Sequence, residues 1–274
     1  MLTPRRTLVI AVATALGTIA APAAAQPAAA ARSAIPPSVA ATTPAHRPFA
    51  VGERFGYEVK YGPMRVGRGS IELAEVASVR GQPAWRAVFK LKGGNALYSL
   101  DNTFQSWIDT ASLASLRFVK DVRERGKSRS KTFEIYPERG VYEELGKGER
   151  PTVESPLDDA SFFYFVRTVP LVVGESYKFD RYFKPDRNPV GLRVMRRERI
   201  TVPAGTFDAV VVRPTIKTSG LLGESRKTEV WLSDDDLRLV LQVRSDLPFG
   251  SITMALGEYR PGGPSEPTVA ANRE

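Results

Sequence analysis

A period of two in hydrophobicity, repeated in short runs along the chain, constrains the fold more than any other feature of this sequence. Residues 85–92 alternate apolar side chains such as Phe89 and Leu91 with others such as Lys90, and Gly93-Gly94-Asn95 ends the run. Because successive side chains of a β-strand point to opposite faces, this alternation predicts a half-buried strand. Comparable runs occupy residues 55–61, 71–75, 132–136, 207–212, 228–232, 239–243 and 251–259.

Turn residues separate these runs and leave only short connections between them. Pro203 and Gly205 indicate a tight turn within 202–207, and Ser233-Asp234-Asp235-Asp236 indicates another between two strands. Connections this short exclude βαβ crossovers, so we expect antiparallel pairing. The sequence therefore predicts an all-β (mainly antiparallel) fold, in which one large curved sheet forms an open half-barrel or a closed barrel.

One segment has helical signals instead. Ser155 stands where an N-cap is expected and Pro156 where the first helical residue is expected, which predicts a helix over residues 158–167 that ends before Pro170. Its apolar residues are not confined to one stripe, so the helix should be covered on several sides. We expect this short aromatic-rich helix to pack on the sheet or to plug the end of a barrel.

The N-terminal residues resemble an export signal. Arg5 and Arg6 precede an apolar run at 7–20, and Ala23-Ala24-Ala25 supplies small residues for cleavage, which predicts a signal peptide at 1–25. With no Cys available for lipid attachment, the prediction is a periplasmic or secreted protein that is not a lipoprotein. We expect a disordered Ala/Pro-rich tether at 26–47, a single β domain at 48–260 and a disordered tail at 261–274.

The counts of reactive side chains exclude much hydrolase chemistry. The chain has no Cys and a single His, His46, which falls in the predicted tether. A Ser-His-Asp triad, a Cys nucleophile and an imidazole zinc site are therefore excluded from the predicted domain. We predict no catalytic residue, no metal site and no cofactor. Asp234-Asp235-Asp236 offers oxygen ligands for a hard cation, but its place between two strands favours a hairpin turn.

Carboxylate chemistry and a Ser-Lys dyad are the alternatives that these counts leave open, and no local signature points to a dyad. An enzyme that acts on envelope glycans through carboxylates needs two acidic side chains facing each other across a cleft, roughly 5–10 Å apart. Asp158 and Asp159 also suit the first turn of a helix, where the dipole favours negative charge. The candidates are Asp109, Asp158, Asp159 and Asp235.

Basic residues cluster within 117–131 of a chain whose formal net charge is +9. Alternate members share parity across a turn near Gly126, so we expect them to face the same way. They form a cationic strip for anionic lipids, glycans or an acidic protein partner, or else a solvated face that protects a sheet edge. The strip comprises Arg123, Arg125, Lys127, Arg129 and Lys131, and a second strip with the same interpretations comprises Arg193, Arg196, Arg197 and Arg199.

The large aromatic residues also have two interpretations. They fill the core, or they line a cleft for an acyl chain, because a curved antiparallel sheet can enclose an apolar ligand. The candidate ligand-binding residues are Tyr98, Phe104, Trp107, Phe162, Phe163, Phe165 and Trp231.

Several motifs, taken in order, resemble a bacterial family. They are Phe49-Ala50-Val51-Gly52-Glu53 before a Tyr-rich strand, Gly67 opening a second strand, Trp107-Ile108-Asp109-Thr110, Leu157-Asp158-Asp159-Ala160, Val202-Pro203-Ala204-Gly205-Thr206-Phe207 and Val230-Trp231-Leu232-Ser233-Asp234-Asp235. Together they make residues 49–259 similar to the bacterial domain of unknown function 3108. Asp158-Asp159-Ala160 departs from the family's Pro-containing sequence at that point.

This resemblance implies an exported protein with a large curved antiparallel sheet and no assigned activity, so no catalytic residue is carried over. The sheet is also similar to those of envelope carriers of lipids and lipoproteins, which is an analogy of fold alone. The leading hypothesis is a non-enzymatic binding, carrier or scaffold protein of the cell envelope for an apolar or amphipathic ligand. The expected partners are a lipid, a lipoprotein or an anionic envelope glycan, with no nucleic acid and at most peripheral contact with a membrane.

Overall fold

The computed structural model describes residues 47–95, 98–124, 126–217, 227–247 and 250–263. The chain divides into two compact units, Met1–Thr42 and Thr43–Glu274, and every described residue belongs to the second. No helix within the described residues is long and apolar enough to cross a bilayer.

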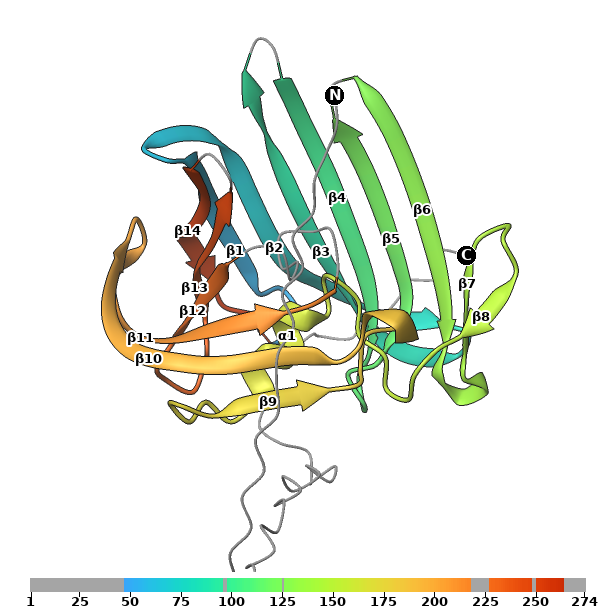
Figure 1. Cartoon of the computed structure of the whole chain (residues 1–274). Coiled ribbons are helices and arrows are strands. Elements are labelled where there is room, and N and C mark those ends of the chain that lie inside the picture. Colours follow the sequence, from blue (N-terminus) through green and yellow to red (C-terminus); the bar gives the residue numbers. More distant parts are fainter. Residues whose placement is uncertain (1–46, 96–97, 125, 218–226, 248–249, 264–274) are drawn as a thin grey trace, which may run out of the picture. The chain divides into compact units, whose positions relative to one another are not determined.

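The described residues contain fourteen strands in one antiparallel sheet, as the alternating pattern predicts (Figure 1). The strands are β1 (Arg54–Tyr61), β2 (Met64–Val79), β3 (Gln82–Asn95), β4 (Tyr98–Asp109), β5 (Ser115–Glu124), β6 (Lys127–Tyr136), β7 (Val141–Glu144), β8 (Glu149–Pro151), β9 (Ser176–Phe179), β10 (Val190–Val202), β11 (Gly205–Thr215), β12 (Thr228–Ser233), β13 (Val240–Leu247) and β14 (Gly250–Arg260). Their order in the sheet is β8-β7-β6-β5-β4-β3-β2-β1-β14-β13-β12-β11-β10-β9. The sheet curves but is not closed, since β8 and β9 form its two edges, so the open half-barrel is the predicted form that is confirmed.

Irregular chain next to the two edge strands joins them at one point. Leu157, which follows β8, forms an isolated parallel bridge with Tyr182, which follows β9. The N–H of Phe183 donates to the carbonyl of Leu157 at 2.9 Å, and the hydroxyl of Thr152 donates to the carbonyl of Phe183 at 2.7 Å. The ends of the open sheet are therefore held together without a continuous ladder.

The inner face of the sheet carries the hydrophobic core. Alternate residues of β1, such as Phe55, Tyr57 and Val59, are buried there, and the helix α1 (Phe162–Phe165) lies against this face with all four residues buried. Phe163 stacks on Phe89 of β3 with ring centroids 5.8 Å apart. Since each fully buried side chain of this size contributes about 1.5–3 kcal/mol, these aromatic residues account for much of the packing, and the predicted helix on the sheet is confirmed.

The predicted start and length of that helix are wrong. Residues 159–161 form a turn, α1 spans only Phe162–Phe165, and the 3-10 helix η2 (Val166–Thr168) continues it. Two further 3-10 helices are η1 (Pro137–Arg139) and η3 (Pro185–Arg187). Ser155 has a φ of 51°, outside the extended range of an N-cap. Asp158 takes the capping role, because its Oδ1 accepts the N–H groups of Ala160 and Ser161 at 2.8 and 2.9 Å.

A buried ion pair ties the segment before β1 to the helical segment. Both side chains of Glu53 and Arg167 are 1% exposed, and Arg167 Nη1 lies 2.7 Å from Glu53 Oε2. Arg167 Nη2 also donates to the carbonyl of Leu237 at 2.9 Å. The guanidinium lies over the rings of Phe49 and Phe55, at 5.3 Å from each centroid. The segment before β1, the helical segment and the β12–β13 hairpin are therefore fastened at one residue.

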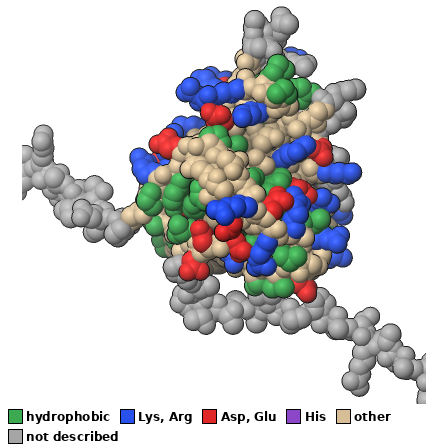
Figure 2. All heavy atoms as spheres, turned by 90° about the vertical axis from the view of Figure 1, so that its left-hand side faces the viewer, with side chains coloured by type: hydrophobic (Ala, Val, Ile, Leu, Met, Phe, Trp, Pro, Cys, Tyr) green, Lys and Arg blue, Asp and Glu red, His purple; other side chains and the backbone are tan. Residues whose placement is uncertain are grey.

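The outer face of the sheet is polar and charged. Arg86 of β3 pairs with Glu75 of β2 at 2.8 Å, and Arg213 of β11 pairs with Glu229 of β12 at 2.7 Å. Figure 2 shows Lys and Arg side chains interspersed with Asp and Glu side chains on the side of the molecule drawn there. Such exposed pairs contribute little to stability, about 0.2–1 kcal/mol each.

Candidate functional site

Side chains on the inner face form rows across β2 to β6, because directly paired residues point to the same side of a sheet. The rows lose their aromatic side chains toward the β1–β2, β3–β4, β5–β6 and β13–β14 hairpins, which lie at the upper end of the sheet in Figure 1. We call this end the rim and define it by its described residues, 58–68, 90–95, 98–101, 120–124, 126–131, 244–247 and 250–254. Three successive rows toward the rim are Ile71-Phe89-Phe104-Lys120-Lys131, Gly69-Leu91-Asn102-Val122-Arg129 and Gly67-Gly93-Leu100-Glu124-Lys127.

A facing glycine pair interrupts the last of these rows. A Cβ on Gly67 would lie 2.5 Å from the carbonyl oxygen of Lys92, and a Cβ on Gly93 would lie 3.0 Å from the Cα of Gly67 and closer still to the carbonyl oxygen of Val66. Strands β2 and β3 therefore approach too closely for any side chain at either position. The missing side chains leave the inner wall open beside Val66 and Leu100.

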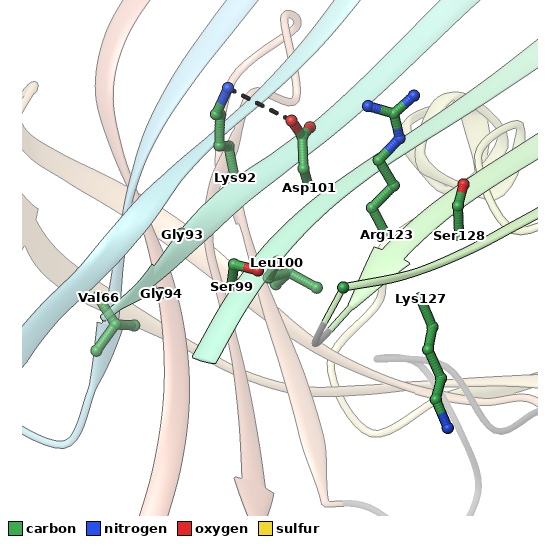
Figure 3. Close-up of a pocket in the computed structure, with 11 residues that line it drawn as sticks. Val66, Lys92, Gly93, Gly94, Ser99, Leu100, Asp101, Arg123, Lys127 and Ser128 are labelled. Atoms are coloured by element: carbon green, nitrogen blue, oxygen red, sulfur yellow. Dashed lines mark ion pairs between the residues drawn. The ribbon is translucent and has the colours of Figure 1, made fainter. Parts of the chain in front are cut away.

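A pocket of about 750 Å³ opens at this notch, and we call it the rim pocket (Figure 3). Figure 3 shows Lys92, Asp101 and Arg123 extending to one side of the strands and Lys127 to the other. The pocket therefore reaches around the ends of β3 to β6. Its lining residues are Val66, Lys92, Gly93, Gly94, Ser99, Leu100, Asp101, Arg123, Gly126, Lys127 and Ser128.

The rim pocket combines an excess of positive charge with an apolar wall. Its lining contains Lys92, Arg123 and Lys127 but a single acidic residue, Asp101, whose Oδ2 lies 3.4 Å from Lys92 Nζ. Those two side chains are 78% and 49% exposed, so their pair is weak. Arg123 and Lys127 form no ion pair within the described residues. An anionic group that enters beside Leu100 would meet cations without first displacing a strong internal partner.

The predicted common face of the first basic strip is wrong. Arg123 pairs with Ser128, whereas Lys127 pairs with Glu124, so Arg123 points to the outer face and Lys127 to the inner face. The β5–β6 loop has two residues, 125 and 126, and an even loop reverses parity across a hairpin. Arg129 and Lys131 share the inner face with Lys127, Lys131 lies 3.1 Å from Glu144, and Arg125 lies outside the described residues.

The second basic strip is largely neutralised. Arg196 pairs with Glu198 at 2.8 Å and Arg197 with Asp234 at 2.7 Å. Arg199 is 4.0 Å from Asp208, and Arg193 is exposed on β10. This strip therefore has less free charge than the rim.

The predicted aromatic set does not line one cleft. Phe162, Phe163 and Phe165 are buried in the core, and Phe104 is half-buried on the inner face. Trp107 pairs with Arg86 and Arg117 on the outer face, where both guanidiniums lie over its ring. Trp231 is also on the outer face, and its Nε1 donates to Glu198 at 2.6 Å. The side chain of Tyr98 lies outside the described residues.

The candidate acidic residues do not face one another as a catalytic pair. Asp109 and Asp235 accept backbone N–H groups within their own turns. Asp159 accepts bonds from Lys120 and Tyr182, both at 2.8 Å. Within the described ranges, no group of three or more acidic or His side chains is placed to hold a metal ion. These carboxylates hold turns and segments together.

Asp158 is completely buried and has an unusual protonation equilibrium. Burial raises its pKa from 3.8 to about 6, against the lowering effect of the bonds from Ser106 and Ser161. Ser106 of β4 donates to Asp158 Oδ2 at 2.6 Å, while Asp158 Oδ1 caps the turn before α1. The carboxyl joins the helical segment to the sheet and has no cleft in front of it among the described pockets.

The sequence predictions missed most of the rim pocket. They included Arg123 and Lys127 but not Lys92, Leu100 or the Gly93-Gly94 pair, which was interpreted as the end of a strand. The structure places Gly93 and Gly94 inside β3. Glycine within a strand often marks a close backbone approach, so the pair itself was the available signal.

The fold places this chain among proteins with one open, curved antiparallel β-sheet, and a similar solved structure is described as beta-barrel-like. The family model described as Protein of unknown function (DUF3108) matches residues 56–257, and the chain belongs to this family. A comparison with curated proteins found no match.

Among similar solved structures, one from Brucella abortus shares the fold and shows nothing beyond it. A beta-barrel-like protein of domain of unknown function DUF1849 from Brucella abortus is 11% identical with a TM-score of 0.52, covering 78% of this chain and 98% of its own. The hypothetical protein CT021 from Chlamydia trachomatis is 11% identical with a TM-score of 0.36, covering 80% and 92%. A DUF1089 family protein from Pseudomonas aeruginosa is 12% identical with a TM-score of 0.38, covering 69% and 92%.

Proposed function

We propose that this protein is a non-enzymatic binding protein of the cell envelope, whose rim pocket holds the anionic head of an amphipathic ligand. The observation that carries the proposal is that one pocket, beside a glycine notch, is lined by Lys92 and Arg123 from one side of the strands, by Lys127 from the other, and by Val66 and Leu100. The signal-like residues 1–25 support export, and a lipid or lipoprotein would supply both an anionic and an apolar part.

The inner face offers a path for the apolar part of such a ligand. Leu100, Leu91 and Phe104 belong to successive rows that lead from the pocket toward α1, and all three are half-buried. An alkyl chain that covers them contributes about 0.8 kcal/mol for each buried CH₂. Phe104 is the member of the predicted aromatic set that lies on this path.

Native mass spectrometry of protein extracted from envelope material tests the proposal. We expect an anionic lipid-like adduct on the wild type that is lost in Leu100→Asp and in the double variant Arg123→Glu with Lys127→Glu. The matched control is Arg193→Glu with Lys178→Glu, which reverses two exposed charges on β10 and β9. Retention of the adduct by both rim variants, or the absence of any adduct from the wild type, would contradict the proposal.

A further inference from the structure

The rim carries most of the net charge of the chain. Its described residues contain 11 of the 39 Lys and Arg residues but only 5 of the 30 Asp and Glu residues. These counts give the described rim a charge of 11 − 5 = +6, compared with a formal +9 for the whole sequence. The meander topology brings the four hairpins to one end of the sheet, so segments far apart in sequence add their charge in one place.

Both faces of the sheet contribute cations at the rim, and several of them are unneutralised. Arg68 points to the outer face, where it pairs with Glu58 across β1 and Lys92 across β3 in the ladder, and Arg129 points to the inner face. Neither forms an ion pair within the described part of the chain. Other rim cations are paired, since Arg65 lies 3.1 Å from Glu58 and Arg244 lies 3.6 Å from Asp246.

An exposed apolar side chain stands among these cations. Met64 is 60% exposed at the β1–β2 hairpin, directly after Pro63 and before Arg65. A single exposed apolar residue is ordinary on a protein surface. At the tip of a cationic end, however, it matches the chemistry of a lipid interface, where apolar contact and anionic headgroups occur together.

We infer that the rim docks peripherally on an anionic lipid bilayer, with Met64 entering the headgroup region and Arg68 and Arg129 approaching lipid phosphates. A bilayer fits better than a soluble anionic glycan, because a hydrated polysaccharide gives Met64 nothing apolar to contact. The docking goes beyond the proposed function, since it does not require the rim pocket to be filled. It also places the mouth of the pocket at the surface from which an amphipathic ligand would enter.

Co-sedimentation with vesicles tests the docking. We expect binding to phosphatidylcholine vesicles that contain phosphatidylglycerol, little binding to phosphatidylcholine alone, and weakening as salt shortens the Debye length. The double variant Arg68→Gln with Arg129→Gln should lower the partition coefficient roughly 10- to 30-fold, given the attraction of each basic residue to an anionic surface. Met64→Asp should lower it as well, and Arg193→Gln with Lys178→Gln should leave it unchanged.

These outcomes are separable from those of the pocket. Arg68, Arg129 and Met64 do not line the rim pocket, so their variants should keep the adduct seen by native mass spectrometry. All three positions are exposed, and thermal unfolding verifies that each variant is folded. Three results would overturn the inference. They are equal binding to neutral vesicles, a partition coefficient that neither Met64→Asp nor Arg68→Gln with Arg129→Gln changes, and capture by a soluble anionic polysaccharide without binding to vesicles.

Discussion

Arg167 joins three segments of the chain, and its replacement should be costly. Arg167→Met removes the only guanidinium that contacts the buried carboxylate of Glu53 in the described structure. A buried charge left without its partner costs about 3–5 kcal/mol, so we expect the free energy of unfolding to fall by that amount. Urea denaturation followed by far-UV circular dichroism measures it.

Arg54→Met is the matched control, because it also removes a guanidinium from an ion pair of β1. Arg54 lies 3.1 Å from Glu72, and the two side chains are 45% and 30% exposed. An exposed pair of this kind contributes about 0.2–1 kcal/mol. Equal losses in the two variants would show that the buried pair has no special role.

The raised pKa of Asp158 predicts that the free energy of unfolding depends on pH, and the direction of the shift gives the sign. Between the ordinary value of 3.8 and about 6, the folded protein keeps a proton that the unfolded chain releases. The stability contributed by this proton is full below 3.8 and is lost as pH rises through about 6. The two-unit shift corresponds to roughly 3 kcal/mol.

The isosteric variant Asp158→Asn isolates this effect. Its amide oxygen can accept the same two N–H groups, and its NH₂ can donate to Ser106, but it has no proton to lose. We expect the difference in free energy of unfolding between wild type and variant to shift toward the variant by roughly 3 kcal/mol from about pH 4 to about pH 7. A difference that stays constant over this range would contradict the assignment.

At the scale of elements, the close approach of β2 and β3 leaves no room for a side chain at Gly93, whereas Gly257 on β14 has room for one. Gly93→Ala forces a Cβ against the backbone of Val66 and Gly67, so we expect a loss of about 1–3 kcal/mol, as in other overpacked sites. Gly257→Ala on β14 meets nothing closer than 3.7 Å and should be neutral or slightly stabilising. Thermal unfolding compares the two, and similar melting temperatures would refute the packing argument.

The sequence predicted the strands well because their signal is local. Alternation in 55–61 or 85–92 depends only on which neighbours face the core, and β1 and β3 contain these runs. The helix start was predicted wrongly, because the Ser155-Pro156 signal was stronger than the weaker cap at Asp158. The start of the helix depends on where the segment becomes buried against the sheet, and no local sequence pattern shows this.

The site was predicted only in part, since it depends on register. Arg123 and Lys127 were recognised as basic, but their opposite faces follow from a loop length that composition does not reveal. Leu100 reaches the same row as Gly67 only after three strands have paired. Long-range pairing of this kind needs the whole sheet before any one side chain can be placed.

At the scale of the whole molecule, the described part of the chain has one main hydrophobic core, which strands from both sides of the sheet share. The core cluster includes Phe55 of β1, Val230 of β12 and Phe163 of α1. The buried hydroxyl of Tyr57 also donates to the carbonyl of Val240 at 2.9 Å, which joins β1 to β13. No group of neighbouring strands therefore keeps a core of useful size once the others separate.

We therefore expect a single cooperative unfolding transition, which the three tryptophans can test. Trp85 and Trp107 report on β3 and β4, whereas Trp231 reports on β12, with β2, β1, β14 and β13 between them in the sheet. The variant Trp231→Phe keeps the first reporters, and Trp85→Phe with Trp107→Phe keeps the second. Within each variant, the urea midpoints from fluorescence and far-UV circular dichroism should coincide even if the substitution lowers stability. A fluorescence midpoint that precedes the circular dichroism midpoint in only one variant would show that one side of the sheet unfolds alone. The shared core and the bonds of Tyr57 and Arg167 would then not couple the two sides.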